Sequence, residues 1–125
     1  MSDVRKHSPL PPSSAARWIA CPPSALKNYE IEDQPSEAAI EGTSAHSLCE
    51  YKLKTALGES VENPTENLDV YNAAMEEHTD GYLQYVLEQI EKAKENCSDP
   101  IVLIEQKLDF TNYVPHGFGT GDCVI

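Results

Sequence analysis

Hydrophobic residues recur at helical spacing in two segments of the chain, and each segment predicts an amphipathic helix. The first runs from about Ser36 or Thr43 to Leu57 and is closed by Gly58. Its apolar stripe consists of Ala45, Leu48, Cys49 and Ala56, flanked by Leu53 and Leu57. The second and longest runs from about Asp69 to Asn96, with an expected buried stripe of Val70, Ala74, Met75, Tyr82, Tyr85, Val86, Ile90 and Ala93. Gly81 within it predicts a kink or close packing.

The N-terminal third is polar and rich in proline. Residues 1–12 predict an extended arm, because three prolines there prevent regular hydrogen bonding. A short helix is expected over Ala15–Ala20, capped by Ser13 or Ser14 and ended by Cys21-Pro22-Pro23. Residues 28–37 and 58–68 are polar and are expected to form loops.

The pattern becomes β-like after Pro100. In Ile101–Phe110 an apolar run passes into alternation, which places Val102, Ile104, Gln106, Leu108 and Phe110 on one face and Glu105 and Lys107 on the other. After a turn-rich segment, a second apolar start follows at Gly121–Ile125. The predicted fold class is therefore α/β, as an α+β arrangement of N-terminal helices followed by the first β-hairpin of a sheet. Because two strands alone are marginally stable, we expect the chain to be the front part of a larger domain.

Charge and composition exclude some classes of protein. The chain has 125 residues, enough for one domain, with 9 Lys and Arg against 21 Asp and Glu and a net charge of −12. Such an excess argues against binding nucleic acid mainly through a basic patch. The apolar runs are too short for a membrane span and no secretory signal opens the chain, so a cytoplasmic protein with unpaired cysteines is expected.

Four acidic or histidine positions are candidates for metal chemistry. His46 and Glu50 lie four residues apart on a predicted helix, so both could reach one divalent ion, although a hydrogen bond between them on a solvated face is the plainer interpretation. Asp122 opens an apolar strand, where a carboxylate needs a partner or a cation, unless it is an ordinary turn residue. Glu105 interrupts an apolar strand and is either a metal carboxylate or a residue on the solvent face.

The cysteines give a weaker signal. Cys21 precedes two prolines, and a lone cysteine more often packs as a small apolar group than binds metal. No CxxC spacing is present, so a zinc site built from Cys and His is a minor alternative.

The order of the motifs resembles RecB-like nucleases of the PD-(D/E)XK superfamily. Ser13–Pro22 is similar to their "S-x-S…CP" opening, Gly42-Thr43-Ser44-Ala45-His46 to their G-T-x-x-H helix, and Gly119-Thr120-Gly121-Asp122 to their G-x-x-D hairpin. More specifically, residues 7–125 resemble the start of a phage- and prophage-associated family, domain of unknown function 2800. Arg17–Ser24, Glu41–Leu53 and Ile104–Ile125 carry that resemblance.

The resemblance implies a metal-dependent DNA nuclease that hydrolyses phosphodiester bonds in an exonuclease-like manner. His46 and Asp122 would bind Mg²⁺ or Mn²⁺, with Glu50 as a further metal candidate and Glu105 as a catalytic one. Cys21 would be one of four ligands of a 4Fe-4S cluster in the full-length protein. DNA and phage recombination or replication proteins would be its partners, with no membrane association.

One departure from the family pattern limits this expectation. In the family, the strand that follows the G-x-x-D hairpin carries a D/E-x-K motif, and neither that strand nor the C-terminal cysteine cluster is among residues 1–125. Residues 13–125 would therefore be a nuclease domain truncated before D/E-x-K, and we expect residues 1–125 alone to be inactive. The alternative is a small acidic phage protein that acts by binding, as a DNA mimic or a helical adaptor, which the net charge and the two amphipathic helices suit.

Overall fold

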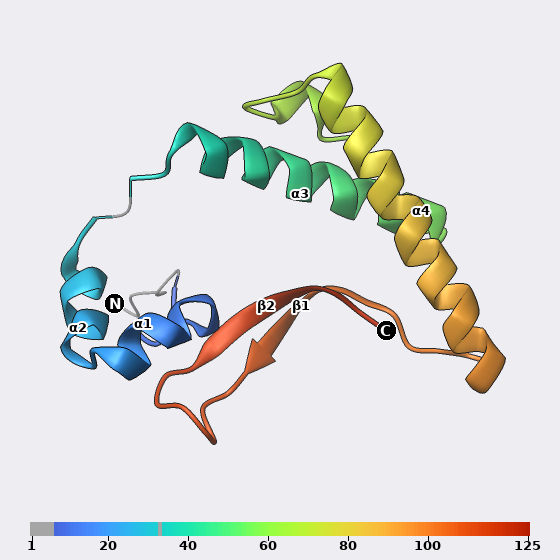
Figure 1. Cartoon of the computed structure of the whole chain (residues 1–125). Helices are drawn as coiled ribbons and strands as arrows, with labels where there is room; N and C mark the ends of the chain where they lie inside the picture. Colours follow the sequence, from blue (N-terminus) through green and yellow to red (C-terminus); the bar gives the residue numbers. More distant parts are fainter. Residues whose placement is uncertain (1–6, 33) are drawn as a thin grey trace. The chain divides into compact units, whose positions relative to one another are not determined.

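The computed structural model describes residues 7–32 and 34–125 (Figure 1). In this part of the chain, helices come first and a two-stranded hairpin follows, which confirms the predicted α+β arrangement. The elements are η1 (Pro12–Ser14), α1 (Ala15–Ala20), α2 (Pro23–Glu30), α3 (Glu37–Ala56), η2 (Thr65–Asn67), α4 (Ala73–Asn96), β1 (Leu103–Asp109) and β2 (Phe118–Val124). Residues 1–6 of the expected N-terminal arm lie outside the described residues.

The two long helices have well-defined ends. At the start of α3, the Ser36 side chain accepts a hydrogen bond from the Ala39 amide at 3.2 Å. After its end, Gly58 has φ +90°, a left-handed conformation that glycine adopts without strain. At the start of α4, the Asn72 side chain accepts from the Met75 amide at 2.9 Å. Local sequence therefore fixes where both helices begin.

The chain divides into two compact units, and the division passes through the hairpin. Unit 2 comprises residues 35–104 and 122–125, with α3 and α4 packed across each other (Figure 1). Its core is formed by Leu53, Val86 and Ile90, each at most 5 % exposed. Val102, Ile104 and Cys123 pack against this cluster. The core thus joins both helices to the ends of the two strands.

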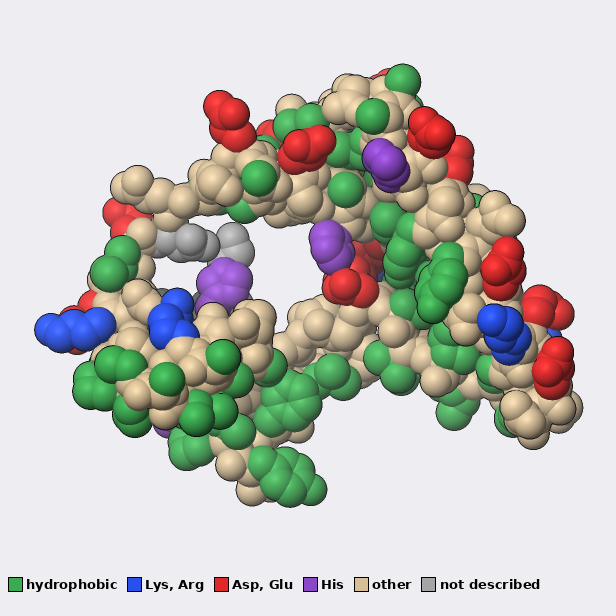
Figure 2. Space-filling view, viewed as in Figure 1, with side chains coloured by type: hydrophobic (Ala, Val, Ile, Leu, Met, Phe, Trp, Pro, Cys, Tyr) green, Lys and Arg blue, Asp and Glu red, His purple; other side chains and the backbone are tan. Residues whose placement is uncertain are grey.

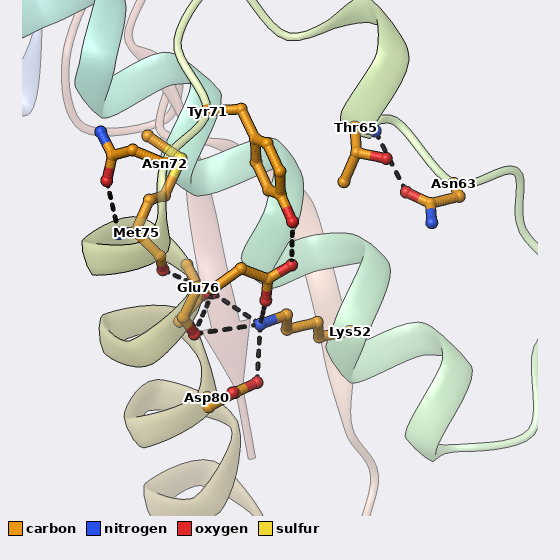
Figure 3. A network of polar contacts seen from close by, with 9 residues as sticks. Lys52, Asn63, Thr65, Tyr71, Asn72, Met75, Glu76 and Asp80 are labelled. Carbon is orange, nitrogen blue, oxygen red and sulfur yellow. Dashed lines mark hydrogen bonds and ion pairs between the residues drawn. The ribbon is translucent and has the colours of Figure 1, made fainter.

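A partly buried cation also ties α3 to α4 within unit 2 (Figure 3). The Lys52 side chain is 12 % exposed, and its Nζ donates to Asp80 Oδ1 at 2.6 Å, to Thr79 Oγ1 at 2.8 Å and to Glu76. Glu76 in turn accepts from the Tyr71 hydroxyl at 2.5 Å. Burial acts to lower the pKa of Lys52, but its hydrogen bonds to Asp80 and Glu76 outweigh that effect and raise the pKa above 10.5.

Unit 1 comprises residues up to 34 and 105–121. Here the N-terminal segment packs on the outer part of the hairpin: Ser8, 5 % exposed, donates from Oγ to the His116 carbonyl at 2.8 Å. The Trp18 indole donates to the Pro11 carbonyl at 3.0 Å, which fixes η1 against α1. Short helices and turns dominate this unit, so side-chain contacts to the backbone hold much of it in place.

Several predicted boundaries are wrong. Helix α2 was not predicted. It extends to Glu30 and so includes the first residues of the loop expected over residues 28–37. Helix α4 begins four residues later than expected, at Ala73. Strand β1 begins at Leu103 instead of Ile101, and β2 begins at Phe118 instead of Gly121. In contrast, α1 has the predicted bounds. Helix α3 begins directly after Ser36, which is one of the two predicted starts.

The predicted buried stripes are also partly wrong. On α4, Tyr85 is 62 % exposed and Ala74 is exposed, whereas the polar Thr79 is 3 % exposed. On α3, Leu53 is fully buried at the centre of the core instead of flanking it, and Ala56 is exposed. Helix α4 continues through Gly81, and a Cβ at this position would meet nothing within 4 Å, so close packing is not the reason for the glycine.

Candidate metal centre

His46 lies in the middle of α3, with its backbone inside the helix and its side chain exposed to solvent. Ser44 and Leu48 are buried on one face of α3, and His46, two residues from each, lies on a different face from this pair. The buried Leu53 is seven residues from His46, about two helical turns, and so lies on nearly the same side of the helix. Before His46, Thr43 is inside the helix, where its Oγ1 donates to the Ala39 carbonyl at 3.0 Å. The helix therefore presents an exposed imidazole on a rigid backbone.

Asp122 lies on β2, one residue before Cys123. Because side chains alternate along a strand, Asp122 points away from the core against which Cys123 packs. The core cluster that includes Leu53 of α3 also contacts Cys123 of β2, so it places the strand beside the helix. Residues 46 and 122 meet through this shared packing and not through any local spacing.

The two side chains approach each other closely within unit 2. His46 Nδ1 lies 3.6 Å from Asp122 Oδ1, and the side chains are 60 % and 58 % exposed. Two protein ligands of one divalent ion, each about 2.0–2.2 Å from it, lie roughly 3 Å or more apart, so this pair is suitably spaced. An imidazole nitrogen beside a carboxylate oxygen, open to solvent, leaves room for water or a phosphate oxygen on the same ion.

The negative charge of Asp122 reaches two neighbouring thiols. Burial raises the pKa of the Cys49 thiol, which Lys52 lowers and Asp122 raises further. Burial and then Asp122 also raise the pKa of Cys123. Both half-buried cysteines are therefore held as neutral thiols beside the pair, and neither is in a disulfide.

Comparison with known proteins places the chain in a family. A family model described as "Protein of unknown function (DUF2800)" matches residues 7–125, which is nearly the whole chain. The chain belongs to the DUF2800 family. No solved structure matches it. Among the residues described, no helix has both the length and the apolar character needed to cross a membrane.

In this DUF2800 chain, Glu50 has a partner other than His46. Its Oε1 lies 2.6 Å from Lys54 Nζ, in an ion pair between residues four apart on α3. The predicted His46–Glu50 pairing on one helix face is not what the structure brings together. Instead the partner of His46 comes from β2, 76 residues further along the chain.

Glu105 is in an unusual backbone conformation. It lies on β1, the hairpin neighbour of the strand that carries Asp122, and its φ is +51°. A left-handed residue other than glycine costs about 1 kcal/mol or more, and such strain is concentrated at functional sites. Within a strand it also interrupts the regular alternation and re-aims the side chain, as bulges do. Glu105 is half-buried, which differs from the exposed position expected for a solvent-face residue.

Cys21 lies in unit 1, at the end of α1. It is exposed, its amide donates to the Arg17 carbonyl at 2.9 Å, and its carbonyl accepts from the Ser24 amide at 2.9 Å. The cysteine thus marks the tight connection between α1 and α2. Its assignment as a ligand of an iron–sulfur cluster stays a prediction.

Sequence reasoning missed Lys52, whose side chain makes several hydrogen bonds between α3 and α4. It lies six residues after His46 on α3 and forms ion pairs with Glu76 and Asp80 of α4 (Figure 3). The sequence contained one signal for this, because Glu76 and Asp80 are four residues apart and share a helix face. Its role is to fix the helix that carries His46.

Proposed function

We propose that this DUF2800 chain binds Mg²⁺ or Mn²⁺ through His46 and Asp122, and that these residues belong to the active site of a phosphodiester-hydrolysing DNA nuclease. The approach of His46 Nδ1 to Asp122 Oδ1 at 3.6 Å carries the proposal. Their positions in the G-T-x-x-H and G-x-x-D motifs, which resemble RecB-like nucleases, connect the pair with nuclease chemistry.

The donor set favours a hard or borderline cation. It offers an imidazole nitrogen and a carboxylate oxygen, while Cys49 and Cys123 are held as neutral thiols. We further propose Glu105 as an additional carboxylate of the site, because it lies on the strand paired with that of Asp122 and is in a strained conformation. A bound divalent ion would lower the pKa of a water molecule and neutralise charge on the scissile phosphate.

The chain's own residues would prepare that chemistry. Helix α3 holds the His46 imidazole in a fixed direction, because Leu53 packs the helix into the core and Lys52 ties it to α4. Asp122 then selects the ring's orientation by its position beside Nδ1. With two or three protein ligands, affinity for a hard cation is expected to be weak and to depend on water ligands.

Metal binding tests the proposal directly and needs no catalytic activity. We expect Mn²⁺ added to the chain to lose its free-ion paramagnetic resonance signal on binding. His46→Ala and Asp122→Ala should each raise the Kd at least about tenfold, as the loss of supporting groups at metal sites does. Glu105→Gln should weaken binding as well.

His78→Ala is the matched control, because His78 is also an exposed histidine within a long helix. It should leave the Kd unchanged. A wild-type chain that binds no Mn²⁺, or a control that loses as much affinity as His46→Ala, would contradict the metal site. Mn²⁺-dependent DNA cleavage by a chain that retains the site, lost in both alanine variants, would extend the proposal from binding to hydrolysis.

A second candidate function has one observation in its favour. The residues of unit 2 include 4 basic and 15 acidic side chains, a net charge of −11 that is typical of a protein that binds a basic partner. Figure 2 shows many of the acidic side chains over α3 and α4. As an acidic binding protein, for example a DNA mimic or an adaptor, the chain would keep its partner affinity in the His46→Ala and Asp122→Ala variants.

A further inference from the structure

The turn of the hairpin presents an aromatic ring almost entirely to water. Tyr113 is 88 % exposed, the highest value among the large hydrophobic residues that the structure describes. A tyrosine ring buries a large apolar area when it is covered, and leaving it in water contributes nothing to folding. The exposed ring is therefore free to contact a ligand without disturbing the packing of unit 1.

The turn that carries Tyr113 is rigidly built. Phe110 is at its centre: its amide donates to the Gly117 carbonyl at 2.8 Å, and its carbonyl accepts from the amides of Tyr113 and Val114, each at 2.8 Å. The Asp109 side chain accepts from the Thr111 amide at 2.9 Å, and this hydrogen bond lowers the pKa of Asp109.

The far side of the turn is equally constrained. The buried Ser8 side chain holds the His116 carbonyl at 2.8 Å, and His116 itself has φ +55°. At Gly117 a Cβ would come within 2.9 Å of Val114 Cβ and its carbonyl oxygen, so no larger residue fits without movement. Strain and a required glycine in one turn indicate a selected conformation, and exposed residues on fixed loops are commonly binding contacts.

The charge around the turn favours one class of ligand. The two longest stretches of the sequence without Asp or Glu are residues 4–29 and 110–121, and both belong to unit 1. The residues of this unit include 5 basic and 6 acidic side chains, a net charge of −1 against −11 for unit 2. Arg17, Lys27 and Lys107 are exposed on it. Unit 1 is thus where the chain repels a polyanion least.

Two of these elements are combined on the hairpin itself. Lys107 Nζ lies 5.5 Å from the centre of the Phe118 ring, so a cation and an aromatic ring lie on the two strands that flank the turn of Tyr113. Aromatic rings that stack bases, next to cations that meet phosphates, are the elements from which single-stranded nucleic acid sites are built. A protein partner could also pack against the exposed ring, but the scarcity of Asp and Glu in unit 1 would not favour its binding as it favours that of a polyanion.

We propose that Tyr113 stacks on an unpaired base of single-stranded nucleic acid and that unit 1 is the surface that contacts this substrate. The proposal rests on the proposed nuclease function. It adds a residue that would contact the bases of the substrate, which His46 and Asp122 would not do. It does not require a metal ion, because neither stacking nor phosphate contact by Arg17, Lys27 or Lys107 involves one.

Binding of a short fluorescein-labelled single-stranded DNA oligonucleotide, followed by anisotropy in EDTA and low salt, tests this directly. Tyr113→Ala should weaken the affinity at least about fivefold, within the range seen when one stacking ring is removed. Tyr113→Phe and Tyr113→Trp should retain it, because they keep a ring. Since Tyr113 contacts little of its own unit, all three variants should unfold at the same urea concentration as the wild type.

Tyr85→Ala is the control, since Tyr85 is 62 % exposed but lies on α4 of the acidic unit, and it should bind as the wild type does. A wild type that binds no oligonucleotide, a Tyr113→Ala variant of unchanged affinity, or an equal loss in Tyr85→Ala would each overturn the stacking proposal. The oligonucleotide assay in EDTA contains no free divalent ion, and the Mn²⁺ titration contains no oligonucleotide. The stacking proposal and the metal proposal can therefore fail independently of each other.

Discussion

Lys52 shows how one side chain can position a site that it does not touch. Its Nζ is nearly enclosed, and it contacts Glu76, Thr79 and Asp80 of α4 from α3. Glu76 and Asp80 are 37 % and 67 % exposed, so water partly screens the interaction. The contribution to stability should fall between that of an exposed ion pair and that of a fully buried one.

Lys52→Met keeps much of the side-chain volume and removes the charge. We expect the free energy of unfolding to fall by about 1–2 kcal/mol, because Glu76 and Asp80 lose their shared cation while Thr79 loses a donor. Lys94→Met is the matched control, since Lys94 pairs with Glu91 at an exposed site and its loss should cost at most about 0.5 kcal/mol. Urea unfolding of the two variants decides, and equal losses would contradict the role of Lys52.

The same network makes the difference in unfolding free energy between the wild type and Lys52→Met depend on pH in a predictable direction. Hydrogen bonds from Lys52 and Tyr71 lower the pKa of Glu76 below 4.5, so its contribution is complete above that pH and is lost as the pH falls through its folded-state pKa. The pKa of Lys52 is raised, so its contribution is present below 10.5 and is lost as the pH rises further. The gap in stability between wild type and Lys52→Met should therefore be constant near neutral pH and narrow in acid below pH 4.5. A gap that persists unchanged in acid would show that packing, and not charge, causes it.

At the scale of elements, two glycines at helix positions should respond to alanine in opposite ways. Gly81 is inside α4 with open space around its missing Cβ, so Gly81→Ala should stabilise the chain by about 0.5–1 kcal/mol through helix propensity. Gly58 follows α3 with φ +90°, so Gly58→Ala should destabilise it by about 1–2 kcal/mol. Urea unfolding of both variants compares their stabilities, and a destabilising Gly81→Ala would contradict the open space around Gly81.

Capping residues explain why some elements were predictable from sequence. Ser36 and Gly58 define α3 through local hydrogen bonding and a left-handed turn, and both signals are readable without a structure. Helix α2 was missed because Pro22-Pro23 was interpreted only as a stop. Proline is also favoured in the first turn of a helix, and Pro23 is the first residue of α2.

Tertiary contacts explain why other features were not predictable. Helical spacing selected Tyr85 for the core and passed over Thr79, whose hydroxyl is buried because it donates to the Met75 carbonyl and accepts from Lys52. The proximity of His46 and Asp122 also depends on packing, since no periodicity relates residues 76 apart. From the sequence, only the resemblance of two separate motifs to one nuclease superfamily connects the two residues.

At the scale of the whole molecule, charge is distributed unevenly between the units. Unit 2 carries a net −11 and unit 1 a net −1, so the acidity that argues against nucleic acid binding belongs mainly to the helical unit. An acidic unit can therefore hold the proposed cation site while the nearly neutral unit meets the polyanion. Like charges crowded in unit 2 must also repel one another, which destabilises the compact state.

This repulsion predicts how stability should respond to salt. Raising NaCl shortens the screening length from about 30 Å at 0.01 M to about 10 Å at 0.1 M, which weakens repulsion between exposed carboxylates across the unit. Lys52 is shielded from solvent and should lose less. Salt should therefore raise the thermal unfolding midpoint by several degrees, since about 1 kcal/mol corresponds to roughly 4–8 °C in a domain of this size class. Choline chloride should act equally if ionic strength is the cause. A further rise in the midpoint with MgCl₂ at the same ionic strength, lost in Asp122→Ala, would instead report binding at the proposed metal site. A midpoint that falls with salt would contradict the prediction and show that ion pairs outweigh repulsion.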